Sequence, residues 1–145
     1  MEIYSIGFTQ KTAEQFFGIL KNAGVRRLLD VRLNNSSQLA GFSKRDDLAY
    51  FLREIVDARY VHEPLLAPTQ EMLDSYKKQK GDWEAYAAAF TALIRTRHIE
   101  RHLDKKSFLQ PTALLCSEPT ALNCHRRLVL EYLQEQWGEF TVTHL

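Results

Sequence analysis

The stretch that decides the fold is Thr112–Leu133, which reads TALLCSEPTALNCHRRLVLEYL. Its first part, Ala113–Cys116, is short and continuously apolar, as expected for a strand that is buried on both faces of a sheet. Its last part, Leu128–Gln136, carries apolar residues at helical spacing and predicts a helix. The loop between them holds two cysteines, an acid and a Cys-His-Arg-Arg run. We therefore expect a buried strand, a loop rich in reactive groups, and a helix.

Length and composition describe one ordinary globular domain. The chain has 145 residues, 45% hydrophobic and 26% charged, which predicts a single globular domain over residues 1–145. The formal net charge of +1 gives no global attraction to nucleic acid or to an anionic membrane. Two cysteines are too few for a disulfide scaffold, and no apolar run reaches transmembrane length. We therefore expect a cytoplasmic location without membrane contact.

Strand and helix signals alternate along the chain. Strands are expected at Glu2–Ile6, Val25–Val31, Arg59–His62, Ala113–Cys116 and Phe140–Leu145. Helices are expected after Thr12, after Ser43, from Thr69 to about Lys80, after Asp82, and over Leu128–Gln136. Thr12 has capping-box spacing to Gln15. The polar face of the helix after Asp82 reaches Arg101. This order predicts a three-layer α/β/α domain in which a single, mostly parallel sheet of about five strands has helices on both faces.

Polar or reactive residues follow four of the expected strands. They are Gly7-Phe8-Thr9, Asp30-Val31-Arg32, His62-Glu63 and Cys116-Ser117-Glu118. Because the carboxyl ends of parallel strands meet at one edge of a sheet, we expect these residues to lie together beside the helix start at Cys124. The sequence therefore predicts a ligand site at this edge, next to the polar loop of residues 33–42.

The same motifs resemble the family called domain of unknown function 488. The matching residues are Ile6-Gly7, Asp30-Val31-Arg32, Tyr60-Val61-His62 with Pro64, Cys116-Ser117-Glu118 and Cys124-His125-Arg126. They keep the family's order over nearly the whole chain. The resemblance implies a small cytoplasmic α/β domain and no particular activity. The chain departs from the family at Phe8, where a histidine is usual, and at Leu65–Pro68, where the family has Leu-Gly-Gly.

A weaker likeness runs to rhodanese-type domains. Leu28–Arg32 and the apolar strand that ends in Cys116 are similar to the pattern around a rhodanese active loop. Short α/β strands resemble one another easily, so this likeness is an analogy only.

Cys124 is the first candidate for a catalytic nucleophile. A helix start carries a partial positive charge that, with His125 and Arg126 adjacent, can lower the pKa of a thiol. The alternative is a small apolar residue packed at the helix start. Cys116 closes a core strand, where we expect it to contact a ligand or to be buried. A disulfide between the two cysteines is disfavoured in a reducing cytosol.

Arg126 and Arg32 are candidates for holding an anion, together with His125. A guanidinium binds phosphate or carboxylate with two parallel hydrogen bonds. A cation at a helix start is disfavoured by the helix dipole unless an anion offsets it, which makes Arg126 the more informative of the two. The alternative for both arginines is an ion pair with Asp30 or Glu118.

Asp30, Glu118 and His62 are the candidates for acid–base catalysis. The alternative is that each makes structural hydrogen bonds at the sheet edge. Zinc needs three or four ligands in a recognisable set. Cys116, Cys124, His125 and His62 could supply them, but the seven-residue gap between the cysteines matches no zinc finger or ribbon. No metal site and no particular cofactor is therefore predicted.

Taken together, these features favour a site for a small anionic or nucleotide-like ligand, with a cysteine-assisted transferase or hydrolase as the candidate activity. The alternative is a non-catalytic module that binds nucleic acid or a protein partner, with Lys105-Lys106 contacting phosphates. A metal or redox protein is the third hypothesis.

Overall fold

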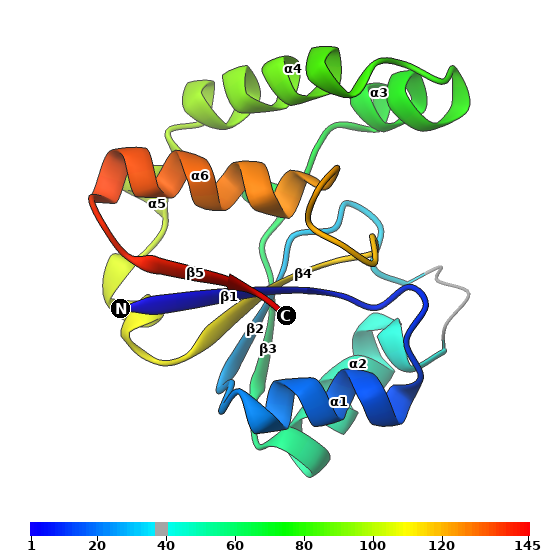
Figure 1. Ribbon diagram of the computed structural model, residues 1–145, viewed down its shortest axis with the longest axis vertical. Coiled ribbons are helices and arrows are strands. Elements are labelled where there is room, and N and C mark those ends of the chain that lie inside the picture. Colours follow the sequence, from blue (N-terminus) through cyan, green and yellow to red (C-terminus); the bar gives the residue numbers. More distant parts are fainter. Residues whose placement is uncertain (37–40) are drawn as a thin grey trace.

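A computed structural model of the chain shows a three-layer α/β/α domain built on one sheet (Figure 1). The structure describes residues 1–36 and 41–145. Within these ranges the strands are β1 (Glu2–Gly7), β2 (Arg27–Asp30), β3 (Arg59–His62), β4 (Thr112–Cys116) and β5 (Thr141–His144). All of them pair in parallel, in the order β3-β2-β4-β1-β5. The predicted fold class is confirmed.

Helices cover both faces of the sheet (Figure 1). One face carries α1 (Ala13–Asn22) and α2 (Arg45–Phe51), and a π-helical turn at Leu52–Val56 extends α2. On the other face α6 (His125–Trp137) lies on the sheet, and α4 (Trp83–Thr96) packs outside it. The same side holds α3 (Gln70–Leu73), a π-helical turn at Asp74–Lys78, and α5 (Ile99–His102); 3-10 turns occur at Gly41–Ser43, Pro64–Leu66 and Lys105–Leu109.

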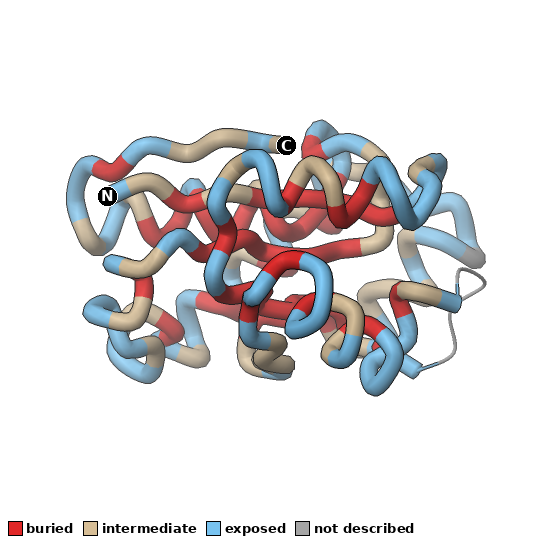
Figure 2. Tube along the Cα trace, turned by 90° about the horizontal axis from the view of Figure 1, so that it is seen from below, coloured by how far each residue is buried: buried red, intermediate tan, exposed pale blue. Residues whose placement is uncertain are grey.

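The central position of β4 in the sheet explains why its sequence is continuously apolar. All of its residues are buried, because helices cover both of its faces (Figure 2). Side chains alternate across a strand, so Leu114 packs in the core under α6 while Ala113 and Leu115 pack in the core over α1 and α2. This strand therefore joins the two halves of the core, and its carboxyl end is fixed from both sides.

The start of α1 confirms the predicted capping box. The Thr12 side chain accepts a hydrogen bond from the Gln15 backbone N–H at 3.1 Å, and the Gln15 side chain accepts one from the Thr12 N–H at 2.9 Å. Replacing Thr12 by alanine removes one of these bonds and is expected to lower the free energy of unfolding by about 1 kcal/mol in urea titrations. Alanine at exposed Thr120 is the control, expected to change stability by less than about 0.5 kcal/mol. Equal effects at both positions would contradict the capping role.

The expected cap at Ser43 is wrong. Ser43 is fully buried in a 3-10 turn, and α2 begins at Arg45 after Lys44, which makes no side-chain capping bond. The Ser43 carbonyl instead accepts a hydrogen bond from Arg32 Nη2 at 2.8 Å. Ser43 thus lies in the turn before α2, and its backbone carbonyl holds Arg32. The predicted loop at 33–42 falls partly outside the described residues.

The helix after Asp82 is also shorter than predicted. It ends at Thr96 because His98 adopts a left-handed backbone conformation (φ 52°), and residues up to Arg101 belong to the separate helix α5. The helix that was predicted over Leu128–Gln136 begins earlier, because α6 starts at His125. Among the helices of residues 1–36 and 41–145, we find none with both the length and the apolar character needed to cross a membrane.

Candidate functional site

A cavity of about 130 Å³ lies at the carboxyl edge of the sheet, where β4 leads into the loop before α6. From the adjacent strands β2 and β4 the chain leaves toward opposite faces, to α2 and α6 respectively (Figure 1). Such a switch point is where parallel α/β sheets bind their ligands. The cavity is lined by Arg32, Leu33, Asn34, Pro68, Leu73, Tyr76, Lys77, Trp83, Tyr86, Cys116, Ser117, Glu118, Asn123, Cys124 and His125.

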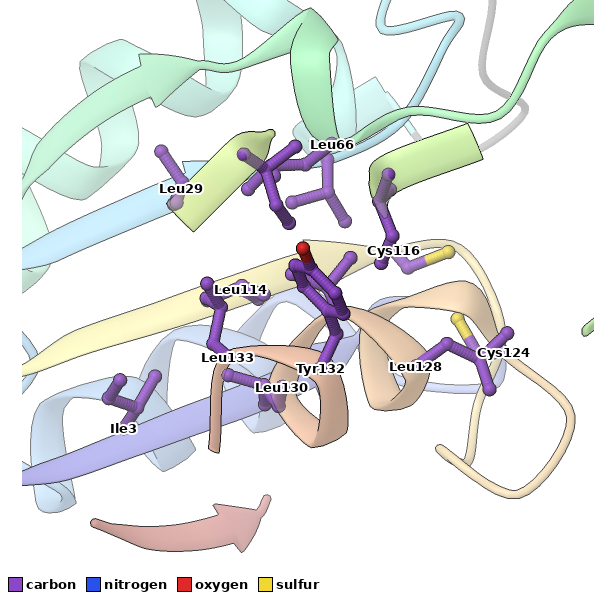
Figure 3. Close-up of a cluster of buried hydrophobic side chains, with 14 of the residues drawn as sticks. Ile3, Leu29, Leu66, Leu114, Cys116, Cys124, Leu128, Leu130, Tyr132 and Leu133 are labelled. Atoms are coloured by element: carbon purple, nitrogen blue, oxygen red, sulfur yellow. The ribbon is translucent and has the colours of Figure 1, made fainter. Parts of the chain in front are cut away.

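Two cysteines and a histidine meet at this cavity. Figure 3 shows both sulfur atoms close to the end of β4 and the start of α6. The Cys116 Sγ lies 3.6 Å from His125 Nδ1, and the three donor atoms of Cys116, Cys124 and His125 all lie within 4.8 Å of one another. His125 Nε2 lies 2.7 Å from the Val31 carbonyl oxygen. Because a carbonyl only accepts, Nε2 carries a proton and donates it, and Nδ1 faces the sulfurs.

Within this cluster the two thiols differ in acidity. A hydrogen bond from Cys124, helped by the charge and hydrogen bond of His125, holds the pKa of Cys116 well below its usual range despite burial. Burial and the neighbouring Cys116 raise the pKa of Cys124. Burial lowers the pKa of His125, but the charge and hydrogen bond of Cys116 outweigh it, so the net shift is upward. The sequence predicted a lowered thiol pKa for Cys124, whereas the contacts in the structure lower the pKa of Cys116.

Arg126 does not line the cavity. Its side chain is 0% exposed, with Nε donating to Ser5 Oγ at 3.1 Å and Nη1 donating to the Glu118 carbonyl oxygen at 3.0 Å. Its Nη2 has no hydrogen-bond partner in the described parts of the chain. These contacts tie the loop after β4 to β1. The unusual cation at a helix start is thus partly compensated by oxygen atoms of the fold itself.

Arg32 lines the cavity and is held from behind by Asp30. The fully buried Asp30 carboxylate accepts from Arg32 Nε at 2.9 Å and from Nη2 at 2.8 Å, and Tyr60 donates to it at 2.5 Å. Arg32 Nη1 is buried without a hydrogen-bond partner among residues 1–36 and 41–145. His62 Nε2 lies 2.8 Å from the Arg32 carbonyl oxygen. Asp30 and His62 therefore surround Arg32 but do not line the cavity.

Part of the cavity lining is aromatic, with Tyr76, Trp83 and Tyr86 among its residues. The Trp83 and Tyr86 rings stack with centroids 5.4 Å apart, and the Tyr76 and Tyr86 centroids are 4.9 Å apart. Lys77 and Glu118 form an ion pair at the cavity, each side chain partly exposed. The cavity thus offers aromatic rings, a partly exposed pair of charges and the Cys–His cluster.

Five of the eight predicted site residues line the cavity: Arg32, Cys116, Glu118, Cys124 and His125. The other three, Asp30, His62 and Arg126, lie behind it. Trp83, Tyr86 and Lys77 also line the cavity, and the sequence analysis did not identify them as site residues. The spacing of three residues between Trp83 and Tyr86 puts both aromatic rings on one side of α4. Only the packing of α4 against α6 brings that side to Cys116.

Fold and site together define a class: a small parallel α/β domain with a cysteine–histidine cluster at its topological switch point. The family model of Domain of unknown function DUF488 matches residues 12–133, a range that contains every residue lining the cavity. The chain belongs to this family, as its motifs predicted. Searches of curated proteins and of solved structures found no match.

Proposed function

We propose that the cavity binds a small ligand that carries a flat ring and an anionic group, and that the Cys–His cluster assists a transfer or hydrolysis reaction on it. The observation that carries this proposal is the convergence of three reactive side chains and aromatic side chains on one cavity. These groups come from β4, α4 and α6, which the chain brings together at a switch point.

The aromatic side chains of the cavity support the ring. Trp83 and Tyr86 both line the cavity, and stacking of a base on an aromatic ring contributes about 1–3 kcal/mol. A nucleobase or a phenyl ring fits this chemistry better than an aliphatic chain does.

Two cations support the anionic group. Arg32 has a buried N–H donor at Nη1 that no described residue accepts, and leaving such a donor unpaired costs about 1–3 kcal/mol. Lys77 lines the same cavity. In this arrangement Asp30 and His62 act as positioning residues, because their hydrogen bonds fix Arg32.

The reaction is assigned to the residues that the ligand would touch. Cys116, Cys124 and His125 are the reactive groups lining the cavity, and Glu118 beside Lys77 is the carboxylate available for proton transfer. Arg126, which donates a hydrogen bond to the Glu118 carbonyl oxygen, is a positioning residue for this loop.

Ligand binding can be measured by the fluorescence of Trp83, in a Trp137→Phe background that leaves one tryptophan. We expect adenosine monophosphate or phenyl phosphate to quench it at lower concentration than adenosine or inorganic phosphate alone. Lys77→Gln removes a charged hydrogen-bond donor and should weaken binding roughly tenfold or more. Glu118→Gln frees Lys77 from its ion pair and should strengthen binding.

A matched control is Lys21→Gln, an exposed lysine in the last turn of α1, which should leave ligand affinity unchanged. Opposite effects at Lys77 and Glu118, with none at Lys21, support the proposed anion position. If all three variants behave alike, or if none of the ring-bearing phosphates binds, the proposal is wrong.

A further inference from the structure

We infer that Cys116, Cys124 and His125 form a binding site for one zinc-type cation, with a fourth coordination position open to the cavity. The inference rests on the location of the proposed function, since it identifies what the Cys–His cluster does there. It does not depend on which ligand the cavity takes.

The spacing of the donor atoms fits a tetrahedral zinc ion. Zinc–sulfur bonds of about 2.3 Å and zinc–nitrogen bonds of about 2.0–2.1 Å at a tetrahedral angle place sulfur and nitrogen about 3.6 Å apart. The Cys116 Sγ and His125 Nδ1 are 3.6 Å apart. Both sulfurs and this nitrogen lie within 4.8 Å of one another, so small side-chain rotations bring all three to one ion.

The hydrogen bond on the far side of the His125 ring is also the one expected of a metal ligand. A zinc-bound imidazole usually donates its other N–H to a carbonyl or carboxylate, which fixes the ring and its tautomer. His125 has this arrangement, with Nε2 donating to the Val31 carbonyl oxygen at 2.7 Å and Nδ1 directed to the sulfurs. The Phe90 ring packs edge-on against the imidazole, with centroids 5.3 Å apart, and stabilises the same orientation.

The local backbone explains how two adjacent residues can share one ion. Cys124 is the N-cap of α6 and has an extended backbone (φ −136°, ψ 138°), whereas His125 is the first helical residue. The change of conformation between them directs both side chains toward the end of β4. Cys124 makes no side-chain capping bond that would hold its sulfur elsewhere. A strand end and a helix start therefore supply the set, which is why the sequence spacing matches no zinc finger.

The fourth position is left for water or for a ligand. Within the described ranges the metal-ligand group contains three residues, each at most 6% exposed, and all three line the cavity. Structural zinc sites are closed by four protein ligands, whereas catalytic sites use three and keep one position open. Two thiolates balance the charge of a divalent ion, and the ion in turn can polarise a bound water or an anionic ligand at the cavity floor.

The first test is metal content and thiol protection in the wild-type chain. Protein purified without chelator and analysed by elemental mass spectrometry is expected to hold one zinc per chain. Because the chain has two cysteines, intact-mass spectra count their alkylation directly. Iodoacetamide should modify neither thiol in the zinc-loaded protein and at least one after removal of zinc by a chelator. Replacement by cobalt should give the visible absorption of a tetrahedral site and a thiolate charge-transfer band.

The second test uses ligand variants. Cys124→Ala and His125→Ala should each lower zinc affinity, measured by competition with a chromophoric chelator. The loss should exceed the roughly 10–100-fold loss that follows removal of a residue hydrogen-bonded to a metal ligand. His102→Gln, at an exposed histidine of α5, is the control for adventitious surface binding and should change nothing. Circular dichroism shows whether each variant is folded, and the wild-type alkylation test needs no variant.

A metal that is absent, or that binds equally well to the ligand variants, overturns the inference. So does rapid alkylation that zinc does not suppress, since the cluster is then a free thiol centre. Neither result affects the quenching of Trp83 by ring-bearing phosphates, which tests the proposed ligand separately.

Discussion

Replacing Asp30 by alanine is expected to lower the free energy of unfolding by about 3–5 kcal/mol, the range for removing one partner of a buried ion pair. Asp30 is 0% exposed and its carboxylate accepts hydrogen bonds from Arg32 and Tyr60. Without it the buried Arg32 guanidinium keeps its charge and loses its counter-charge. Urea denaturation followed by circular dichroism measures the change.

The control is Asp57→Asn, because Asp57 has a left-handed backbone (φ 58°) that asparagine tolerates and alanine does not. Asp57 also pairs with an arginine, Arg26 at 2.6 Å, but the two side chains are 86% and 55% exposed. An exposed pair contributes about 0–1 kcal/mol, so this variant should remain nearly as stable as the wild type. Comparable losses in the two variants would mean that burial does not set the energy of the Asp30–Arg32 pair, contrary to our interpretation.

Replacing Gly7 by alanine is expected to destabilise the protein by at least the roughly 1–3 kcal/mol that overpacking of a core costs. A Cβ at this position would lie 1.6 Å from the Glu118 carbonyl oxygen and 2.7 Å from its carbonyl carbon. Both atoms belong to backbone, so no side-chain rotation relieves the contact. The loop after β4 must move away from β1, and Cys116 and Glu118 move with it.

Gly18→Ala is the control for this substitution. Nothing lies within 4 Å of a Cβ at Gly18, which is in the middle of α1, so alanine there should stabilise by about 0.5–1 kcal/mol. Opposite signs at the two glycines, seen in thermal and urea unfolding, are the expected result. A Gly7→Ala protein that is as stable as the wild type would show that the loop after β4 does not need this close approach.

These contacts give the family motifs a common structural reason. The Ile-Gly motif ends β1 without a side chain at Gly7, so the backbone at Glu118 can lie against it. The carbonyl of Glu118 accepts a hydrogen bond from Arg126, and Thr9 donates its N–H to the Ser117 carbonyl at 3.1 Å. The Ile-Gly motif at the end of β1 and Arg126 at the start of α6 therefore hold the loop after β4 from two sides, and that loop lines the cavity.

Local sequence signals predicted most of the secondary structure. The capping box at Thr12, the cap at Asp82 and the strand at Arg59–His62 were predicted from adjacent residues and are present. Such features depend on hydrogen bonds and spacing over a few residues. The end of α4 near His98 and the role of Ser43 were not predicted, since a left-handed backbone residue and a tertiary hydrogen bond decide them.

For the candidate site, the sequence by itself determined that it lies at the carboxyl edge of the sheet and which reactive groups gather there. Parallel strands all end on the same side, so their order along the chain was sufficient to bring Arg32, Cys116 and the start of α6 together. Only the tertiary structure decided where each group lies and what it contacts. It buried Arg126 against β1, lowered the pKa of Cys116 rather than that of Cys124, and brought Trp83 into the lining of the same cavity as the cysteines. These outcomes depend on distances between elements that are remote in sequence, which periodicity and motif spacing do not contain.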